Sequence, residues 1–282
     1  MRAYEKILIL YFSYAAILSF ALPAEARLRA TTLIVLAMMA ALFLLLARLE
    51  RRTKSRAIAI TRDWLPVIVT LLCYREIGWF ATGRTLFGLE SRFEAWDHWL
   101  LATMGGRAVI ESLGPLLPGL LELAYLLLYG FGAFGLGMLY GYKARERVDR
   151  FWTVTLLGLL FCYVQYPFWP SEPPRTVFPG AESPHVVTIF RSLNQMLVGH
   201  YGIHTSVFPS AHVGGATAAA LGMLYLLPEH RWVGWSLLVL AFLIAAGAVY
   251  GRYHYTADVA AGALMGLLAF GLSVKILWPR IR

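Results

Sequence analysis

Two histidines and an aspartate near the C-terminal end of the chain have the types and spacing that phosphoryl chemistry requires. His254 and Asp258 are four residues apart, so on a helix they would lie on the same face. A carboxylate there can accept a hydrogen bond from one imidazole nitrogen and leave the other nitrogen free to attack phosphorus. His212, which comes earlier in the chain, could then protonate the oxygen that leaves.

Basic and hydroxyl side chains close to these groups are suited to holding the phosphate. Arg175 ends the run Pro-Ser-Glu-Pro-Pro-Arg, and Ser210 lies in the run Pro-Ser-Ala-His. Arg252 precedes His254 by two residues. Arginine side chains and N–H groups at helix N-termini neutralise phosphoryl oxygens. We therefore expect catalytic roles for three residues and phosphate-binding roles for three others: His254, His212 and Asp258, and Arg175, Ser210 and Arg252.

The remaining histidines offer one alternative chemistry. His200 and His204 are also four residues apart and, together with His212, could suggest a zinc site. No cysteine or acidic ligand stands nearby to complete such a site, so we assign the pair to a substrate loop and expect neither a metal nor a cofactor. Cys73 and Cys162 both fall in apolar runs and are interpreted as small core residues.

Composition indicates what must position these residues. The chain has 282 residues, of which 59% are hydrophobic and only 15% are charged, a balance that is unusual for a soluble domain. Apolar runs recur that are long enough to cross a hydrocarbon core of roughly 30 Å. They are too long and too continuous for the strands of a membrane barrel. The net charge of +9 is assigned to cationic loops that orient the chain in a bilayer, and we expect no nucleic-acid partner.

We predict an all-α, polytopic membrane helical bundle. Its expected spans are 7–22, 31–47, 64–81, 119–140, 151–166, 209–227, 232–249 and 255–277. We divide the chain into residues 1–63, two extra N-terminal transmembrane helices with a basic loop, and residues 64–282, a six-helix catalytic core. Segment 82–118 is expected to lie along the outer membrane surface or to re-enter the membrane, and 167–208 to form a long, proline-rich polar loop. Arg75 and Glu76, inside the third span, should face the bundle interior or an interface.

The basic residues predict an orientation. With the N-terminus in the cytoplasm, most of the 25 lysines and arginines fall on the cytoplasmic side, as the positive-inside rule requires. The segment 167–208 and the starts of the sixth and eighth spans then share the opposite face. We therefore expect an integral protein of the plasma (inner) membrane, with both termini cytoplasmic and the active site on the non-cytoplasmic side.

The polar motifs together resemble those of the type-2 phosphatidic acid phosphatase superfamily, whose second motif is Pro-Ser-Gly-His and whose third ends in His-x-x-x-Asp. The resemblance covers about 64–277, so the first two helices would be an addition. It implies a phosphohistidine mechanism with His254 as nucleophile, Asp258 as its orienting partner, and His212 as general acid and then base. It implies phosphate binding by Ser210, Arg175 and Arg252, and no metal.

The sequence departs from the family pattern at each motif. Phe168 and Thr176 replace a lysine and a proline of the first motif, and Ala211 replaces the glycine of the second. Gly247 and Ala248 occupy the positions of the serine and arginine of the third, where Arg252 is the candidate substitute. The short Arg-x-His-Tyr-Thr-Ala-Asp form is closer to the branch that contains inositol phosphorylceramide and sphingomyelin synthases.

Three functions follow as hypotheses. The first is a lipid-phosphate phosphatase that cleaves a phospholipid or polyprenyl (pyro)phosphate head group at the non-cytoplasmic face. The second is a phosphotransferase that passes a phospho-head group to a lipid or sugar alcohol through the same intermediate. The third is a non-catalytic transporter or structural membrane protein, which the lack of a repeat or of a broken-helix pair disfavours. The expected partners are a lipid substrate and the bilayer itself.

Overall fold

The computed structural model describes residues 1–81, 87–203 and 207–278, and within these ranges the chain is helical and contains no β-strand. The α-helices, in chain order, are α1 (Ala3–Ala21), α2 (Ala26–Thr53), α3 (Arg56–Gly78), α4 (Phe87–His98), α5 (Gly106–Glu111), α6 (Leu116–Leu127), α7 (Phe131–Gly141), α8 (Val148–Tyr163), α9 (Pro174–Val177), α10 (Ile189–Tyr201), α11 (Ala211–Leu226), α12 (Arg231–Tyr250) and α13 (Thr256–Leu272). Short 3-10 or π-helical turns extend or join several of them: Trp99–Thr103, Leu128–Gly130, Arg145–Arg147, Pro228–His230 and Ser273–Leu277. The predicted all-α helical bundle is confirmed.

The lengths of the helices fit a membrane protein. Six stretches of the described chain are long and apolar enough to cross a bilayer: Ala3–Ala21, Ala26–Thr53, Arg56–Gly78, Leu116–Gly141, Pro228–Tyr250 and Thr256–Leu277. These six correspond to predicted spans. The other two predicted spans are the 16-residue helices α8 and α11, which are shorter than the rest and lie at the centre of the bundle.

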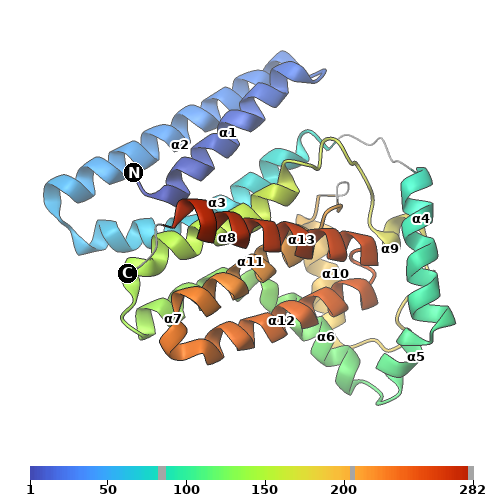
Figure 1. Cartoon of the computed structure of the whole chain (residues 1–282). Helices are drawn as coiled ribbons and strands as arrows, with labels where there is room; N and C mark the ends of the chain where they lie inside the picture. The colour runs from blue at the N-terminus through green and yellow to red at the C-terminus, as the bar shows by residue number, and fades with distance from the viewer. Residues whose placement is uncertain (82–86, 204–206, 279–282) are drawn as a thin grey trace.

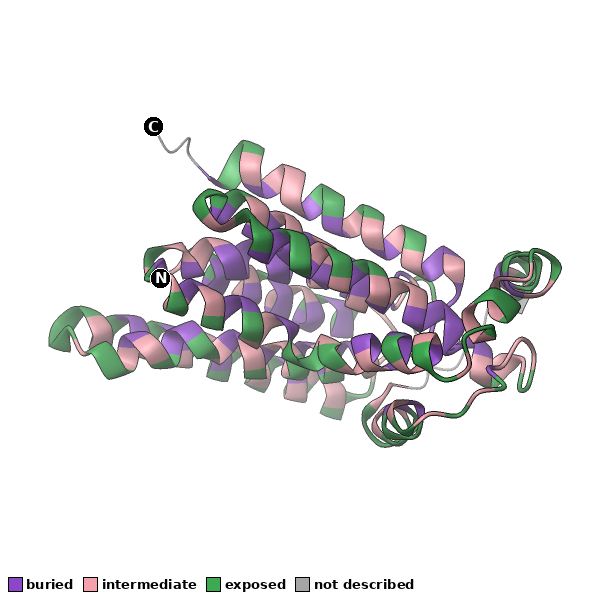
Figure 2. Cartoon of the chain, turned by 90° about the horizontal axis from the view of Figure 1, so that it is seen from below, coloured by how far each residue is buried: buried purple, intermediate pink, exposed green. Residues whose placement is uncertain are grey.

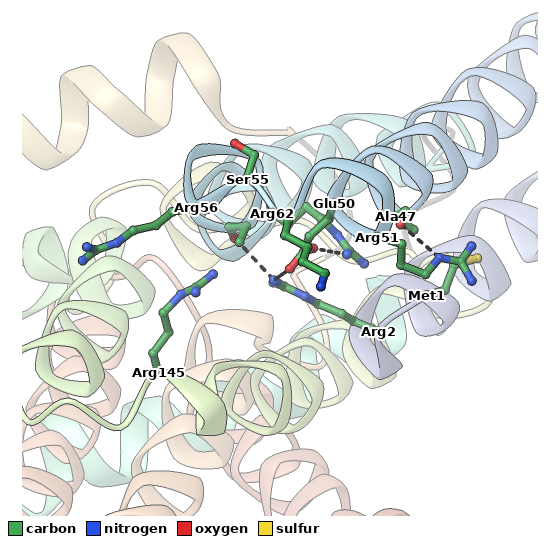
Figure 3. Close-up of a pocket in the computed structure, with 11 residues that line it drawn as sticks. Met1, Arg2, Ala47, Glu50, Arg51, Ser55, Arg56, Arg62 and Arg145 are labelled. Atoms are coloured by element: carbon green, nitrogen blue, oxygen red, sulfur yellow. Dashed lines mark hydrogen bonds and ion pairs between the residues drawn. The ribbon is translucent and has the colours of Figure 1, made fainter.

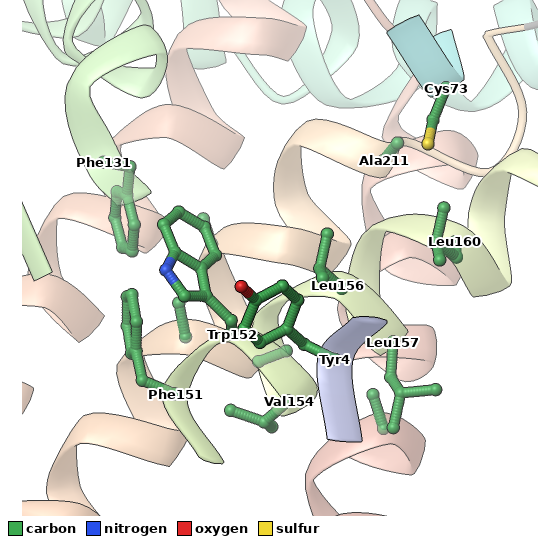
Figure 4. Packing of buried hydrophobic residues seen from close by; sticks show 14 of the residues in the cluster. Tyr4, Cys73, Phe131, Phe151, Trp152, Val154, Leu156, Leu157, Leu160 and Ala211 are labelled. Carbon is green, nitrogen blue, oxygen red and sulfur yellow. The ribbon is translucent and has the colours of Figure 1, made fainter. Parts of the chain in front are cut away.

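The core is built around α8, α11 and α13, which pack closely against one another (Figure 1). Phe151, Trp152 and Leu156 of α8 are buried, and Tyr4 of α1 and Phe131 of α7 lie beside them (Figure 4). The indole Nε1 of Trp152 donates a hydrogen bond of 2.8 Å to the backbone oxygen of Asp63, so its one polar atom is satisfied inside the apolar core.

Small residues bring the central helices into near contact. A Cβ on Gly214 of α11 would lie 2.7 Å from the backbone oxygen of Gly158 on α8, and one on Gly262 of α13 would lie 2.3 Å from the backbone oxygen of Ser210. Both distances are shorter than atoms can approach, so these positions require glycine for the helices to meet as they do.

The N-terminal hairpin of α1 and α2 is attached to the rest by packing and by charge. α1 packs on α8, and Asp149 of α8 accepts hydrogen bonds from the backbone nitrogens of Ala3 and Tyr4 at 3.0 and 3.1 Å. α2 leaves large apolar side chains such as Ile34 and Met38 exposed, which is the surface expected of a lipid-facing helix. Figure 2 shows this distribution, with buried residues on the inward faces of the helices and exposed residues on the outward faces.

One predicted loop is partly helical. Segment 167–208 contains α9 and the 13-residue α10. The side chain of Thr188 caps α10 by accepting a hydrogen bond of 3.2 Å from the backbone nitrogen of Arg191, and Arg191 and Asn194 face inward. The prolines all precede this stretch, so the proline-based prediction of a continuous loop was wrong for its second half.

The two charges predicted inside the third span lie in different environments. Glu76 is fully buried and has no hydrogen-bond partner within the described residues, whereas Arg75 is exposed and donates to the backbone oxygen of Tyr201 at 3.3 Å. Glu76 thus faces the bundle interior. Arg75 links the end of α3 to the end of α10.

Candidate active site

The two predicted catalytic histidines lie side by side. His212 is in the first turn of α11, and His254 is in the tight turn between α12 and α13. The Nδ1 atom of His212 is 3.2 Å from the Nε2 atom of His254, and the rings are nearly perpendicular, at 81°, with centroids 5.3 Å apart. The two imidazoles are therefore close enough to act on the same phosphoryl group.

Asp258 lies on the other side of His254. Its Oδ2 atom is 3.3 Å from the Nδ1 atom of His254, and it also accepts a hydrogen bond of 2.9 Å from the backbone nitrogen of Tyr255. With Asp258 ionised, its carboxylate can only accept, and this contact then assigns the proton to Nδ1 of His254 and the lone pair to Nε2. That lone pair is directed toward His212.

Backbone contacts fix the relation between the two histidine-bearing helices. The hydroxyl of Ser210 caps α11 by accepting from the backbone nitrogen of Val213 at 3.5 Å. The backbone nitrogen of Ser210 donates to the backbone oxygen of Asp258 at 2.9 Å, so the N-terminus of α11 is tied directly to the first turn of α13. Gly262 permits the close approach that this bond requires.

The environment of His254 keeps it neutral. The residue is only 4% exposed, and burial, followed by the positive charge of Arg175, lowers the pKa of its imidazole to about 3. A neutral imidazole is the form in which Nε2 can act as a nucleophile.

Arg175 is a predicted phosphate ligand with no ion-pair partner among the described residues. It lies in the short helix α9, donates to the backbone oxygen of Tyr253 at 3.5 Å, and places its guanidinium 5.7 Å from the centre of the Tyr253 ring. Within the described residues, no carboxylate is within ion-pair distance of it, and burial lowers its pKa. A half-buried cation without a counter-ion, close to the histidine pair, is suited to bind a phosphate.

Arg252 and Ser210, the other two predicted phosphate ligands, both contact groups of the protein itself. The side chain of Arg252 is 1% exposed, and its guanidinium forms ion pairs with Asp97, at 2.5 Å, and with Glu94 of α4. Its φ of +63° turns the chain ahead of His254. In this arrangement Arg252 holds α4 against the histidine turn, and the Ser210 hydroxyl caps α11. Their roles as phosphate ligands stay predictions.

A buried polar network supports the site from the side of α6 and α10, and the sequence analysis did not anticipate it. Glu122 of α6 accepts hydrogen bonds from Arg191 at 2.9 Å, from Asn194 at 2.8 Å and from the hydroxyl of Tyr253 at 2.8 Å. The Tyr253 ring stacks on Tyr125, with centroids 4.3 Å apart. In the sequence, Glu122 is the one carboxylate in the apolar run 119–140. A single acidic residue at such a position indicates a buried polar contact and could have pointed to this network.

Tyr125 extends this network to the histidines. Its hydroxyl lies 3.5 Å from the Nδ1 atom of His212, and its ring meets the His212 ring edge to face, with centroids 5.7 Å apart. The aromatic pair of Tyr125 and Tyr253 thus forms a wall of the site that connects Glu122 with His212.

The alternative zinc site receives no support from the described residues. His200 is exposed, and its Nδ1 atom lies 2.8 Å from the backbone oxygen of Met196, while His204 lies outside the described residues. Across the described part of the chain, no group of three or more histidine, cysteine or acidic side chains has a metal-binding arrangement.

The fold and these contacts define a class, the polytopic membrane proteins that carry a histidine pair and an aspartate at the ends of central helices. Comparison with known families specifies it further: the model of the PAP2 superfamily matches residues 92–272, and the chain belongs to that superfamily. Its members are membrane phosphatases and phosphotransferases. The family match supports an enzyme at this level, and the predicted inositol phosphorylceramide synthase-like branch stays a prediction.

One curated relative is similar over a short stretch. The chain is 42% identical over 62 residues to the bacitracin transport permease protein BcrC of Bacillus licheniformis, a stretch that makes up 22% of this chain and 29% of that protein. The chain thus matches less than a third of the length of this relative. No solved structure gives a significant match.

Proposed function

We propose that the protein is a lipid-phosphate phosphatase that acts through a phosphohistidine intermediate on a phospholipid or polyprenyl (pyro)phosphate head group. The observation that carries the proposal is the continuous arrangement of Asp258, His254 and His212, with separations of 3.3 and 3.2 Å between the interacting atoms. Membership of the PAP2 superfamily supports the reaction class.

In the first step, Nε2 of His254 attacks the phosphorus atom. A P–N bond forms, the P–O bond to the lipid breaks, and the leaving oxygen takes a proton from His212. Asp258 stabilises the positive charge that develops on His254, and Arg175 stabilises the negative charge on the phosphoryl oxygens. The negative charge of a bound phosphate favours the protonated form of a neighbouring imidazole, which prepares His212 as the acid.

In the second step, His212 removes a proton from water, and the resulting nucleophile attacks the phosphorus atom. The P–N bond breaks, inorganic phosphate leaves, and both histidines return to their starting states. If an alcohol takes the place of water, the same step transfers the phospho-group to the alcohol. The second predicted function therefore differs from the first only in the acceptor.

We place this chemistry at the non-cytoplasmic face of the membrane. The proposal is supported by the separation of charge in the bundle. The turn between α2 and α3 and the Arg145–Arg147 turn, both rich in arginine, lie at the end opposite the histidines, as do the start of α1 and the end of α13 (Figure 1). Basic loops favour the cytoplasmic side of a membrane.

A release assay with matched variants tests the proposal. Purified protein is incubated with phosphatidic acid or with a polyprenyl pyrophosphate, and inorganic phosphate is followed with and without inositol or a lipid alcohol as acceptor. We expect release in water alone, with losses of at least about a thousandfold in His254→Ala and His212→Ala. His230→Ala, which removes an imidazole that stacks on Tyr142 at the opposite end of the bundle, should retain activity.

The intermediate is tested separately. With substrate labelled on phosphorus, an alkaline quench should trap a base-stable label on the wild type and none on His254→Ala, and the label should be lost on later treatment with acid. Label that persists in His254→Ala would refute His254 as nucleophile. Turnover that requires an alcohol would assign the transferase, and full function of His254→Ala would leave only a non-catalytic role.

A further inference from the structure

A polar cavity lies at the end of the bundle opposite the histidines. Its volume is about 720 Å³, and it opens between the N-terminus of α1, the turn that joins α2 to α3, and the Arg145–Arg147 turn (Figure 3). The 23 residues of α3 rise about 34 Å between this cavity and the histidine end, at about 1.5 Å per residue. The cavity is therefore separate from the candidate active site.

The charges that line this cavity are strongly unbalanced. Six of the lining residues are cationic and one, Glu50, is acidic. Three of the cations are paired with carboxylates: Arg2 with Asp63 at 2.5 Å, Arg62 with Glu5 at 2.7 Å, and Arg145 with Asp63 at 2.6 Å. These pairs form the wall of the cavity.

The other three cations, Arg51, Lys54 and Arg56, have no carboxylate within ion-pair distance among the described residues. They are contributed by a single turn, in which Lys54 has a φ of +51° and ends α2, and Ser55 caps α3. The turn thus gathers three side chains that no described carboxylate neutralises between the last turn of α2 and the first turn of α3. Like charges gathered on one cavity repel one another, and a bound anion would remove that repulsion.

The position of the cavity indicates which anion it would bind. It lies where two membrane helices, α2 and α3, meet at their polar ends, and both carry exposed apolar side chains beyond it, such as Leu45 and Trp64. An anion with a phosphate at the cavity and hydrocarbon along these helices would satisfy both surfaces. Membrane surfaces supply such molecules as anionic phospholipids.

We propose that this cavity is a binding site for the phosphate head group of an anionic membrane lipid, in the leaflet opposite the histidines. Arg51, Lys54 and Arg56 contact the phosphate, and the paired arginines keep the cavity open. The lipid holds α1, α2 and α3 together at this end and takes no part in the reaction.

The test compares two variants of the full chain that lose the same charge. R51Q/K54Q/R56Q removes the unpaired cations of the cavity, and R52Q/K143Q/R231Q removes three exposed cations outside its lining. Each purified protein, in neutral detergent, is titrated with dioctanoyl phosphatidylglycerol or, in a parallel arm, with inorganic phosphate. The midpoint of thermal unfolding reports binding, because a ligand that binds only the folded state raises it.

We expect phosphatidylglycerol to stabilise the wild type, the cavity variant to need at least tenfold more lipid for the same shift, and the control variant to stay within twofold of the wild type. Equal weakening of both variants would mean general electrostatic attraction and would overturn the proposal, as would an unchanged cavity variant. An equal response to inorganic phosphate would overturn the assignment to a lipid. If the triple variant fails to fold, Arg56→Gln and Arg52→Gln form the same comparison with one charge each.

Discussion

Asp97→Asn would separate a positioning role of Arg252 from a phosphate-binding role. Asp97 is fully buried, and its Oδ2 atom is 2.5 Å from Arg252, while its Oδ1 atom accepts from the backbone nitrogen of Thr256 at 2.9 Å. Asparagine preserves the size and the acceptor toward Thr256 but removes the charge that faces Arg252. The substitution therefore tests the ion pair and not the cap of α13.

The expected magnitude follows from burial. Removing one partner of a buried ion pair costs about 3–5 kcal/mol when nothing else compensates the charge that is left. Glu94 still pairs with Arg252, so we expect a loss of about 2–3 kcal/mol and a fall of about 5–10 °C in the unfolding midpoint. Because Arg252 directs the turn that carries His254, kcat should fall while KM changes little.

Thermal unfolding and phosphate release, measured on the same preparation, check this expectation. Glu146→Gln is the control, because its ion pair with Arg147 is 3.3 Å long and its side chain is 68% exposed, so its loss should cost less than about 1 kcal/mol. If Asp97→Asn is as stable as this control, the ion pair does not hold the turn. A lower KM in Asp97→Asn would instead mean that Arg252, once released, binds the substrate phosphate.

Three further predictions follow from other contacts. Gly262→Ala should lower the unfolding midpoint and abolish phosphate release, because the added Cβ would lie 2.3 Å from the backbone oxygen of Ser210. Gly271→Ala on the same helix is the control: its added Cβ would have no atom within 4 Å, so both assays should be unchanged. Glu122→Gln should destabilise the protein by about 3 kcal/mol in denaturant unfolding, because it leaves the buried guanidinium of α10 without a carboxylate; a neutral result would contradict the network. Burial lowers the pKa of His254 to about 3, so the unfolded state binds one more proton than the folded state below about pH 6.5. The free energy of unfolding should therefore fall by up to about 1.4 kcal/mol per pH unit between about pH 6 and 4. In His254→Ala it should fall less steeply.

The fold class and the histidine pair could be predicted from the sequence because both depend on local patterns. Long apolar runs identify membrane helices, and the spacing of His254 and Asp258 places them in one turn. His212 could be assigned to the site because polar residues at the start of an apolar membrane helix cost free energy and are therefore typically functional. These inferences needed no knowledge of which helices touch.

The partners of charged residues were not predictable in the same way. Arg252 was expected to bind phosphate, and its pairing with Asp97 joins residues that are far apart in the chain. Arg191 was given no role, because its partner Glu122 is on another helix. A sequence shows that a buried charge needs a counter-ion but not which element supplies it.

The hydrogen bond from the backbone nitrogen of Ser210 to the backbone oxygen of Asp258 has a consequence for how this protein can change over time. The spacing of the two imidazoles is set by main-chain atoms, which every amino acid except proline can provide at the donor position. Side chains that neither touch this contact nor hold the turn of His254 are therefore free to diverge, and a lineage could acquire a new lipid or a new acceptor while its reaction centre keeps the same dimensions.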